Sequence, residues 1–71
     1  MTYIIEEVFL SGETTILKKV HTMEAVHKLL SEITNNNYGM NDYKINSFAK
    51  ILRYHTLDNE RNFNVHLIED K

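Results

Sequence analysis

The sequence predicts a small α+β fold of the order β-β-α-β-β, in which a four-stranded antiparallel sheet has one helix packed on one face. Three observations lead to this prediction. Segments rich in β-branched and aromatic residues stand near both ends of the chain, a segment between them has the period of a helix, and clusters of Gly, Asn and Asp separate the segments. With 71 residues the chain has room for one core, so residues 1–71 are expected to form a single domain.

The first hairpin is expected at the N-terminal end. Tyr, Ile, Val and Phe dominate residues 3–10, which is the composition of a strand. This strand ends at Ser11 and Gly12, and glycine adopts a positive φ without steric cost. Residues 14–21 then resume with β-branched side chains. Two such runs joined by a short turn predict a β-hairpin.

A helix is expected next, over residues 23–34. Thr22 offers a side-chain hydroxyl as the N-cap, and Glu24 places a negative charge in the first turn. Because Asn and Gly tolerate the left-handed conformation of a helix C-terminus, residues 35–42 are expected to form the loop that ends the helix. The apolar residues that recur at helical spacing are Met23, Val26, Leu29, Leu30 and Ile33.

Two periods fit residues 43–56. As a helix, this segment gives the alternative order β-β-α-α-β. A strand is preferred for at least residues 49–56, because the turn-like cluster at residues 57–60 leads into residues 63–67, where apolar and polar residues alternate strictly. These two strands are expected to pair as a second hairpin.

The strands carry more apolar residues than one helix can cover. A sheet covered on one face alternates apolar and polar residues, whereas this sequence has adjacent apolar pairs in several strands. Neighbouring strand residues point to opposite faces, so the face opposite the helix is expected to bind another protein or a second copy of the chain. Ordinary exposure at the ends of the sheet explains the same pairs equally well. The residues expected to bind a protein, with two tyrosines as aromatic anchors, are Ile4, Val8, Leu10, Ile51, Ile68, Tyr43 and Tyr54.

The histidines do not have the spacing of a metal site. The chain has no cysteine, which excludes disulfides, thiolate catalysis and cysteine-based zinc sites. His21 and His27 lack the i, i+4 spacing that places two ligands on one face of a helix. His55 and His66 are expected to be neighbours across the second hairpin, where they supply at most two ligands. No metal or cofactor is therefore expected.

No residues are arranged for catalysis either. Glu6 and Glu7 are adjacent in a predicted strand, so their carboxylates point to opposite faces and do not converge as an acid and base. The two glycines are isolated, which excludes a phosphate-binding glycine loop. The sequence therefore predicts a protein that is not an enzyme.

Nucleic-acid binding is the alternative interpretation. A basic stripe beside Tyr43 and Tyr54 would attract a phosphate backbone. Ten acidic residues compete with eight basic ones, and the net charge is −2, so a mixed, solvated surface is favoured over this stripe. The basic residues in question are Lys18, Lys19, Lys44, Lys50, Arg53 and Arg61.

The cell compartment and class of partner are expected from composition. The lack of cysteine is typical of the cytoplasm, and Glu6 and Glu7 within residues 1–10 are untypical of a signal peptide or membrane span. The abundance of Asn, Ile, Lys and Tyr without proline is typical of AT-rich genomes, and hence of small accessory proteins of phages and mobile elements. The leading hypothesis is a noncatalytic module that binds a host protein or itself, by an apolar face or by an open sheet edge; the alternative is a small nucleic-acid-associated regulator.

Overall fold

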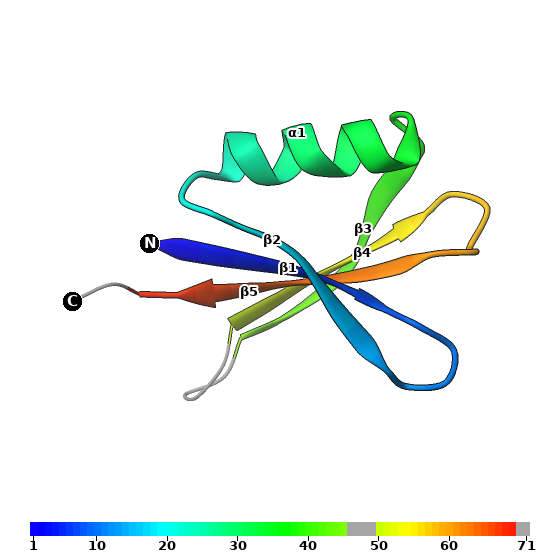
Figure 1. Cartoon of the computed structure of the whole chain (residues 1–71), viewed down its shortest axis with the longest axis horizontal. Helices are drawn as coiled ribbons and strands as arrows, with labels where there is room; N and C mark the ends of the chain where they lie inside the picture. Colours follow the sequence, from blue (N-terminus) through cyan, green and yellow to red (C-terminus); the bar gives the residue numbers. More distant parts are fainter. Residues whose placement is uncertain (46–49, 70–71) are drawn as a thin grey trace.

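The computed structural model describes the backbone of residues 1–45 and 50–69, and the side chains of residues 1–40 and 50–69. Within these residues the chain forms one helix and five strands of a single antiparallel sheet (Figure 1). The α+β class is confirmed, and the predicted number of four strands is wrong. The elements are β1 (Thr2–Val8), β2 (Thr14–Val20), α1 (Met23–Thr34), β3 (Tyr38–Ile45), β4 (Lys50–Thr56) and β5 (Asn62–Ile68).

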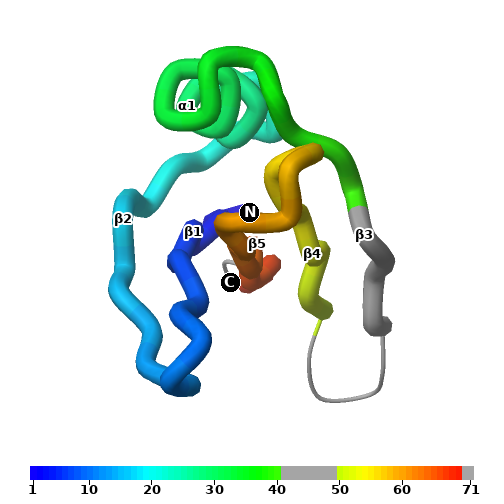
Figure 2. The backbone as a smooth tube through the Cα atoms, turned by 90° about the vertical axis from the view of Figure 1, so that its right-hand side faces the viewer, coloured from blue at the N-terminus to red at the C-terminus, as the bar shows by residue number. Residues whose placement is uncertain are grey.

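The sheet has the strand order β2-β1-β5-β4-β3, so the first strand lies beside the last. Both predicted hairpins are present, since β1 pairs with β2 and β4 pairs with β5. The helix α1 connects the two edge strands, β2 and β3, and lies across one face of the sheet (Figure 2). One face of β1, β5 and β4 is therefore under the helix, while β2 forms an open edge.

The predicted loop at residues 35–42 is wrong beyond residue 37, because β3 begins there. Asn35 and Asn36 both have left-handed backbone, with φ of 56° and 64°, and together they turn the chain out of the helix. The chain is extended from Tyr38, which pairs with Thr56 on β4. Backbone pairing with a neighbouring strand, rather than an apolar alternation of its own, makes this segment a strand.

The strand interpretation of residues 43–56 is confirmed where the structure describes them. Residues 43–45 belong to β3 and residues 50–56 form β4, so the alternative of a second helix is wrong for these residues. Ala49, which was predicted in the strand, lies outside the described residues. The predicted turn at residues 57–60 is present, and the N–H of Asn59 donates to the Thr56 carbonyl at 2.8 Å.

The core lies between α1 and the three central strands. Ile5 on β1 stands opposite Val65 on β5, and Phe63 on β5 stands opposite Tyr54 on β4, so these side chains share the face under the helix. Burying a large apolar side chain contributes about 1.5–3 kcal/mol, which makes this layer the main source of stability. The buried hydrophobic residues of the described part are Ile5, Val20, Val26, Leu30, Tyr54, Phe63 and Val65.

The helix has the predicted bounds because its two ends are capped locally. The Thr22 hydroxyl accepts a hydrogen bond from the N–H of Ala25 at 3.1 Å, which is the N-cap that the sequence predicts. At the other end the N–H of Asn36 donates to the carbonyl of Ser31 at 2.9 Å, while Asn35 takes the left-handed conformation. These caps satisfy backbone groups that the last turns leave unpaired.

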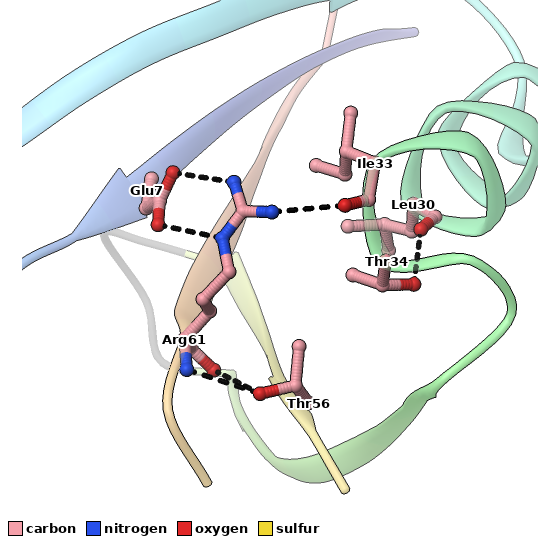
Figure 3. A network of polar contacts seen from close by, with 6 residues as sticks. All are labelled: Glu7, Leu30, Ile33, Thr34, Thr56 and Arg61. Atoms are coloured by element: carbon pink, nitrogen blue, oxygen red, sulfur yellow. Dashed lines mark hydrogen bonds and ion pairs between the residues drawn. The ribbon is translucent and has the colours of Figure 1, made fainter. Parts of the chain in front are cut away.

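Arg61 fastens the end of the helix to the sheet. Its guanidinium donates two hydrogen bonds to the carboxylate of Glu7, at 2.8 and 2.9 Å, and a third to the carbonyl of Ile33 at 2.9 Å (Figure 3). The last turn of α1 contains no basic residue, so Arg61, which directly precedes β5, supplies the positive charge that stabilises a helix C-terminus. The contact joins three elements that are distant in sequence.

The β1–β2 hairpin extends away from the helix at its turn (Figure 1, Figure 2). In this turn the N–H of Phe9 donates to the carbonyl of Glu13, and the N–H of Gly12 donates to the carbonyl of Phe9, both at 2.9 Å. Gly12 has φ of 90°, which explains a glycine at this position. The far end of the hairpin therefore lies beyond the cover of α1.

Candidate functional site

The sheet face away from α1 has a polar centre. Residues that alternate with the core positions point to this face. At its middle, Glu6 stands opposite Asn64, which in turn stands opposite Arg53. Together with the flanking positions, the register gives three rows across β1, β5 and β4: Ile4, His66 and Ile51; Glu6, Asn64 and Arg53; Val8, Asn62 and His55.

Glu6 is the hub of this polar centre. Its Oε1 lies 2.7 Å from Nε2 of His66 and accepts a hydrogen bond from the Asn64 amide at 3.2 Å. Burial alone raises the pKa of the Glu6 carboxyl, but the hydrogen bonds from His66 and Asn64 outweigh it, so the pKa lies below its ordinary value. The carboxylate is therefore ionised near neutral pH, and Nε2 of His66 carries the proton that it accepts.

A hollow of about 200 Å³ lies beside this centre. His55 belongs to the neighbouring row, and its Nδ1 is buried without a hydrogen-bond partner among the described residues. The face can hydrogen-bond polar groups, but it does not offer the continuous apolar surface that the sequence analysis expects. The residues that line the hollow are Val8, Arg53, Tyr54, Asn62, Phe63 and Asn64.

The residues predicted to bind a protein are spread over several places. Ile4 and Ile51 flank His66 on the face away from the helix, and Val8 lies in the row at its other end. Ile68 ends β5 and is exposed, whereas Leu10 lies in the β1–β2 turn, off the sheet, and is fully exposed. The structure therefore does not bring these five residues into one patch.

Of the two predicted tyrosine anchors, Tyr54 is not on that face. Tyr54 is buried under the helix, with its ring centroid 6.0 Å from those of His27 and Tyr38. Burial raises the pKa of Tyr54, with a smaller effect from Tyr38. The side chain of Tyr43 lies outside the described residues. Tyr54 is thus a core residue and does not present its ring to a partner.

Exposed apolar side chains concentrate on the β1–β2 hairpin. Four of the eight exposed large hydrophobic residues in the described part of the chain are on it, and we call them the apolar hairpin end: Phe9, Leu10, Ile16 and Leu17, which are 45%, 104%, 67% and 37% exposed. Of these four, the sequence offers Leu10 as a binding residue and Phe9 as a candidate aromatic anchor, whereas Ile16 and Leu17 were not predicted. The adjacency of Ile16 and Leu17 is the sequence feature from which their exposure could have been predicted, because a strand with one covered face cannot bury two neighbouring residues.

Both edges of the sheet are irregular. On β2, Lys18 pairs with Ile5 and Ile16 with Glu6, so Leu17 is an extra residue on the edge strand. On β3, Asn41 is an extra residue in the same way. Such bulges, together with exposed lysines on β2, are features that limit uncontrolled pairing of sheet edges. Any strand that pairs with β2 therefore meets two short segments instead of one continuous edge.

A groove separates the open edge of the sheet from the helix. Its volume is about 250 Å³. Ala25 and Leu29 are half-buried and form an apolar floor, whereas the remaining lining residues are exposed and charged. Lys18 comes from β2, and the other four residues lie one turn apart on a single face of α1: Ala25, Lys28, Leu29 and Glu32.

The basic residues of the alternative interpretation do not form one stripe. Lys18 and Lys19 lie on β2, separated by β1 and β5 from Lys50 and Arg53 on β4. Lys50 donates to Glu69 at 3.1 Å. Arg61 is bonded to Glu7 and the helix, and the side chain of Lys44 lies outside the described residues. None of the described side chains in the three rows of the opposite face is a Phe or Tyr on which a base would stack.

The histidines do not converge. The predicted pairing of His55 with His66 is wrong, because His55 stands opposite Asn62 and His66 stands opposite Ile51. The register of the hairpin offsets the two rings along the strands. In the part of the chain that the structure describes, no group of three or more His, Cys, Asp or Glu side chains is placed to hold a metal ion.

No protein-family description, curated protein or solved structure matches the chain. The one helix of the described residues, α1, is too short and too polar to cross a membrane.

Proposed function

We propose that this chain is a noncatalytic protein-binding module whose binding surface is the β1–β2 hairpin. The observation that carries the proposal is the apolar hairpin end, where half of the exposed large hydrophobic residues of the described chain gather on one projecting hairpin. Exposed apolar residues that gather on one element are typical of protein-binding surfaces. Phe9 and Leu10 supply apolar area at the tip, and Ile16 and Leu17 extend it along β2.

The opposite face of the sheet is the weaker candidate for this function. The bonded side chains of Glu6, Asn64 and His66 occupy its centre, between Ile4 and Val8 on β1. A partner that covered this face would have to desolvate an ionised carboxylate, which costs free energy unless new hydrogen bonds replace the water. In the apolar hairpin end, Ile16 stands opposite Glu6, but Phe9 and Leu10 lie in the turn beyond Val8, the last paired residue of β1.

The favoured partner is another protein rather than a second copy. If the segments Lys18 to Val20 of two copies paired antiparallel, a lysine of one copy would stand opposite or diagonal to a lysine of the other, which is destabilising. The AT-rich composition adds the expectation that the partner belongs to the host of a phage or mobile element.

Light scattering after size exclusion tests the proposal, with the protein alone and after mixing with a cell extract. The wild type is expected to be monomeric alone and to form a heavier species with extract. A variant with Leu10→Ser and Ile16→Thr should lose that species, and a Leu57→Ser control should keep it, since Leu57 is exposed on a different turn.

Two results would contradict the proposal: no heavier species with any extract or at high concentration, or equal association by the hairpin variant. If the wild type is a dimer and the hairpin variant is a monomer, the hairpin is still the binding surface, but the partner is a second copy of the chain. Both substituted positions are exposed, so loss of folding does not explain loss of association.

A further inference from the structure

The open edge of β2 and the groove beside it form one continuous binding feature. As an edge strand, β2 presents backbone N–H and C=O groups outward at every second residue. Six of its seven residues are exposed, and the buried one, Val20, adjoins Lys19 at the end near the helix. The groove between β2 and α1 meets the edge strand at Lys18, directly after the extra residue Leu17.

The groove suits the side chains of an extended segment. A strand that pairs with the outer edge of β2 turns every second side chain to the side of the sheet on which α1 lies. There the floor of Ala25 and Leu29 offers an apolar contact. The volume of about 250 Å³ is enough for small aliphatic side chains and too small for most drug-sized ligands.

The charges around the groove select the class of segment. Lys18 stands on the strand side and Lys28 on the helix side, against a single carboxylate from Glu32. Both lysines are exposed and come from different elements, so together they flank the groove with positive charge. A segment whose carboxylates lie two positions from its aliphatic residues turns both kinds of side chain to the helix side and meets complementary charge, whereas a second copy of β2 brings Lys18 and Lys19 against lysines.

We infer that the partner binds through an extended segment in which aliphatic and acidic residues stand two positions apart, so that both point to the helix side; the segment adds a strand to β2 near Lys18 and places aliphatic side chains in the groove against Ala25 and Leu29. This inference rests on the proposed function, because it specifies the partner of a protein-binding module. The bulge at Leu17 limits the added strand to a short segment, so the contacts of the groove supply most of the specificity.

The test uses a short fluorescein-labelled peptide in which valine and glutamate take turns at every second position, with threonine between them, and anisotropy measures binding at physiological salt. Amide chemical shifts measured by NMR locate the bound peptide. The shifts are expected at Lys18 to Val20 and around Ala25 and Leu29. A peptide with lysine in place of glutamate, and one with proline in place of valine, should not bind, because they lose the charge and the backbone donors respectively.

Charge reversal on the protein provides matched variants. Lys18→Glu combined with Lys28→Glu should weaken binding of the acidic peptide by about tenfold or more. Lys19→Glu is the control, because Lys19 pairs with Ile4 and faces the side away from the helix. It should change the affinity by less than about twofold, because the side chains that the bound peptide turns to that face are uncharged threonines. All three lysines are exposed, so folding should be unaffected.

The inference is overturned if the acidic peptide binds no tighter than the lysine peptide, if the shifts lie outside the groove, or if Lys19→Glu weakens binding as much as the double reversal. These failures are distinguishable from failure of the proposed function. The double reversal leaves the apolar hairpin end intact, and the variant used to test that end leaves both groove lysines in place.

Discussion

The centre of the sheet under the helix and the β1–β2 hairpin contain the same types of apolar residue, but these residues are buried in the centre and exposed on the hairpin. Ile5 on β1 is fully buried between the helix and the sheet, whereas Ile16, which belongs to the neighbouring strand, is two-thirds exposed. The helix covers the face that holds Ile5 and, on β2, Val20, whereas Ile16 pairs with Glu6 and therefore points to the face away from the helix. Apolar residues of the centre therefore stabilise the fold, and those of the hairpin are available for binding.

The adjacent carboxylates of β1, Glu6 and Glu7, likewise differ in the face of the sheet to which they point. Glu7 points to the helix side, where Arg61 binds it and the end of α1 (Figure 3). Glu6 points to the other side, where His66 and Asn64 hold it. The partners of Glu6 lie on β5, and the partner of Glu7 is the residue directly before β5, so one segment of the chain supplies the polar contacts of both faces.

The largest expected effect separates the two isoleucines. Ile5→Ala should lower the free energy of unfolding by about 2–5 kcal/mol, because it leaves a cavity in the core. Ile16→Ala should change it by less than about 0.5 kcal/mol, because the side chain is already solvated. Urea unfolding monitored by circular dichroism measures both. Similar losses for the two variants would show that β2 is covered in solution.

Glu7 is expected to have the next largest effect. Glu7→Gln removes the charge that accepts two hydrogen bonds from Arg61, and should cost about 1–2 kcal/mol after allowance for solvent at the partly exposed guanidinium. Glu69→Gln is the matched control, since Glu69 binds Lys50 at an exposed site and should cost less than about 0.5 kcal/mol. The same urea titrations measure both variants. Equal losses of unfolding free energy would show that the contact between Glu7 and Arg61 does not stabilise the fold more than the exposed ion pair does.

Acid should remove the contribution of Glu7. The hydrogen bonds from Arg61 are the main cause that holds its pKa in the folded state below the ordinary value of 4.5. A lowered folded-state pKa gives stability that is present above about pH 4.5 and is lost as the pH falls through the folded-state value. The difference in unfolding free energy between the wild type and Glu7→Gln should therefore shrink below that pH. If the difference in unfolding free energy stayed constant down to about pH 3, the carboxylate of Glu7 would not contribute to stability through its lowered pKa.

The smallest expected effect concerns the helix start. Thr22→Ala removes the hydroxyl that accepts from the N–H of Ala25, and should cost about 1 kcal/mol. Thr22→Ser keeps a hydroxyl and should cost less than the alanine variant. Thermal unfolding of the two variants measures the difference. If they were equally stable, the cap would contribute nothing to the packing of α1 on the sheet.

Local sequence patterns predict the hairpins and the helix because their signals act over a few residues. Thr22 and the Asn residues after the helix define its ends, and the adjacency of Glu6 and Glu7 is enough to place them on opposite faces. Longer-range features are not predictable in this way. Tyr38 begins a strand because β4 is available to pair with it, and strong turn signals just before it conceal this.

The candidate surfaces depended still more on tertiary pairing. The contact between Arg61 and Glu7 spans 54 positions of the chain, so composition alone assigned Arg61 to a basic stripe. Phe9, Ile16 and Leu17 have ordinary strand composition, and only the strand order shows that the helix leaves them uncovered. The offset of His55 from His66 likewise follows from the register of the β4–β5 hairpin.

Photo-crosslinking from single positions tests most directly whether the β1–β2 hairpin is the binding surface. Benzoylphenylalanine replaces Leu10 in one variant and Leu57 in another, both exposed leucines in turns. After irradiation in extract, a discrete adduct heavier than the monomer is expected from position 10 and not from position 57. Equal adducts from both positions, or an adduct from position 57 alone, would contradict the assignment of binding to the hairpin.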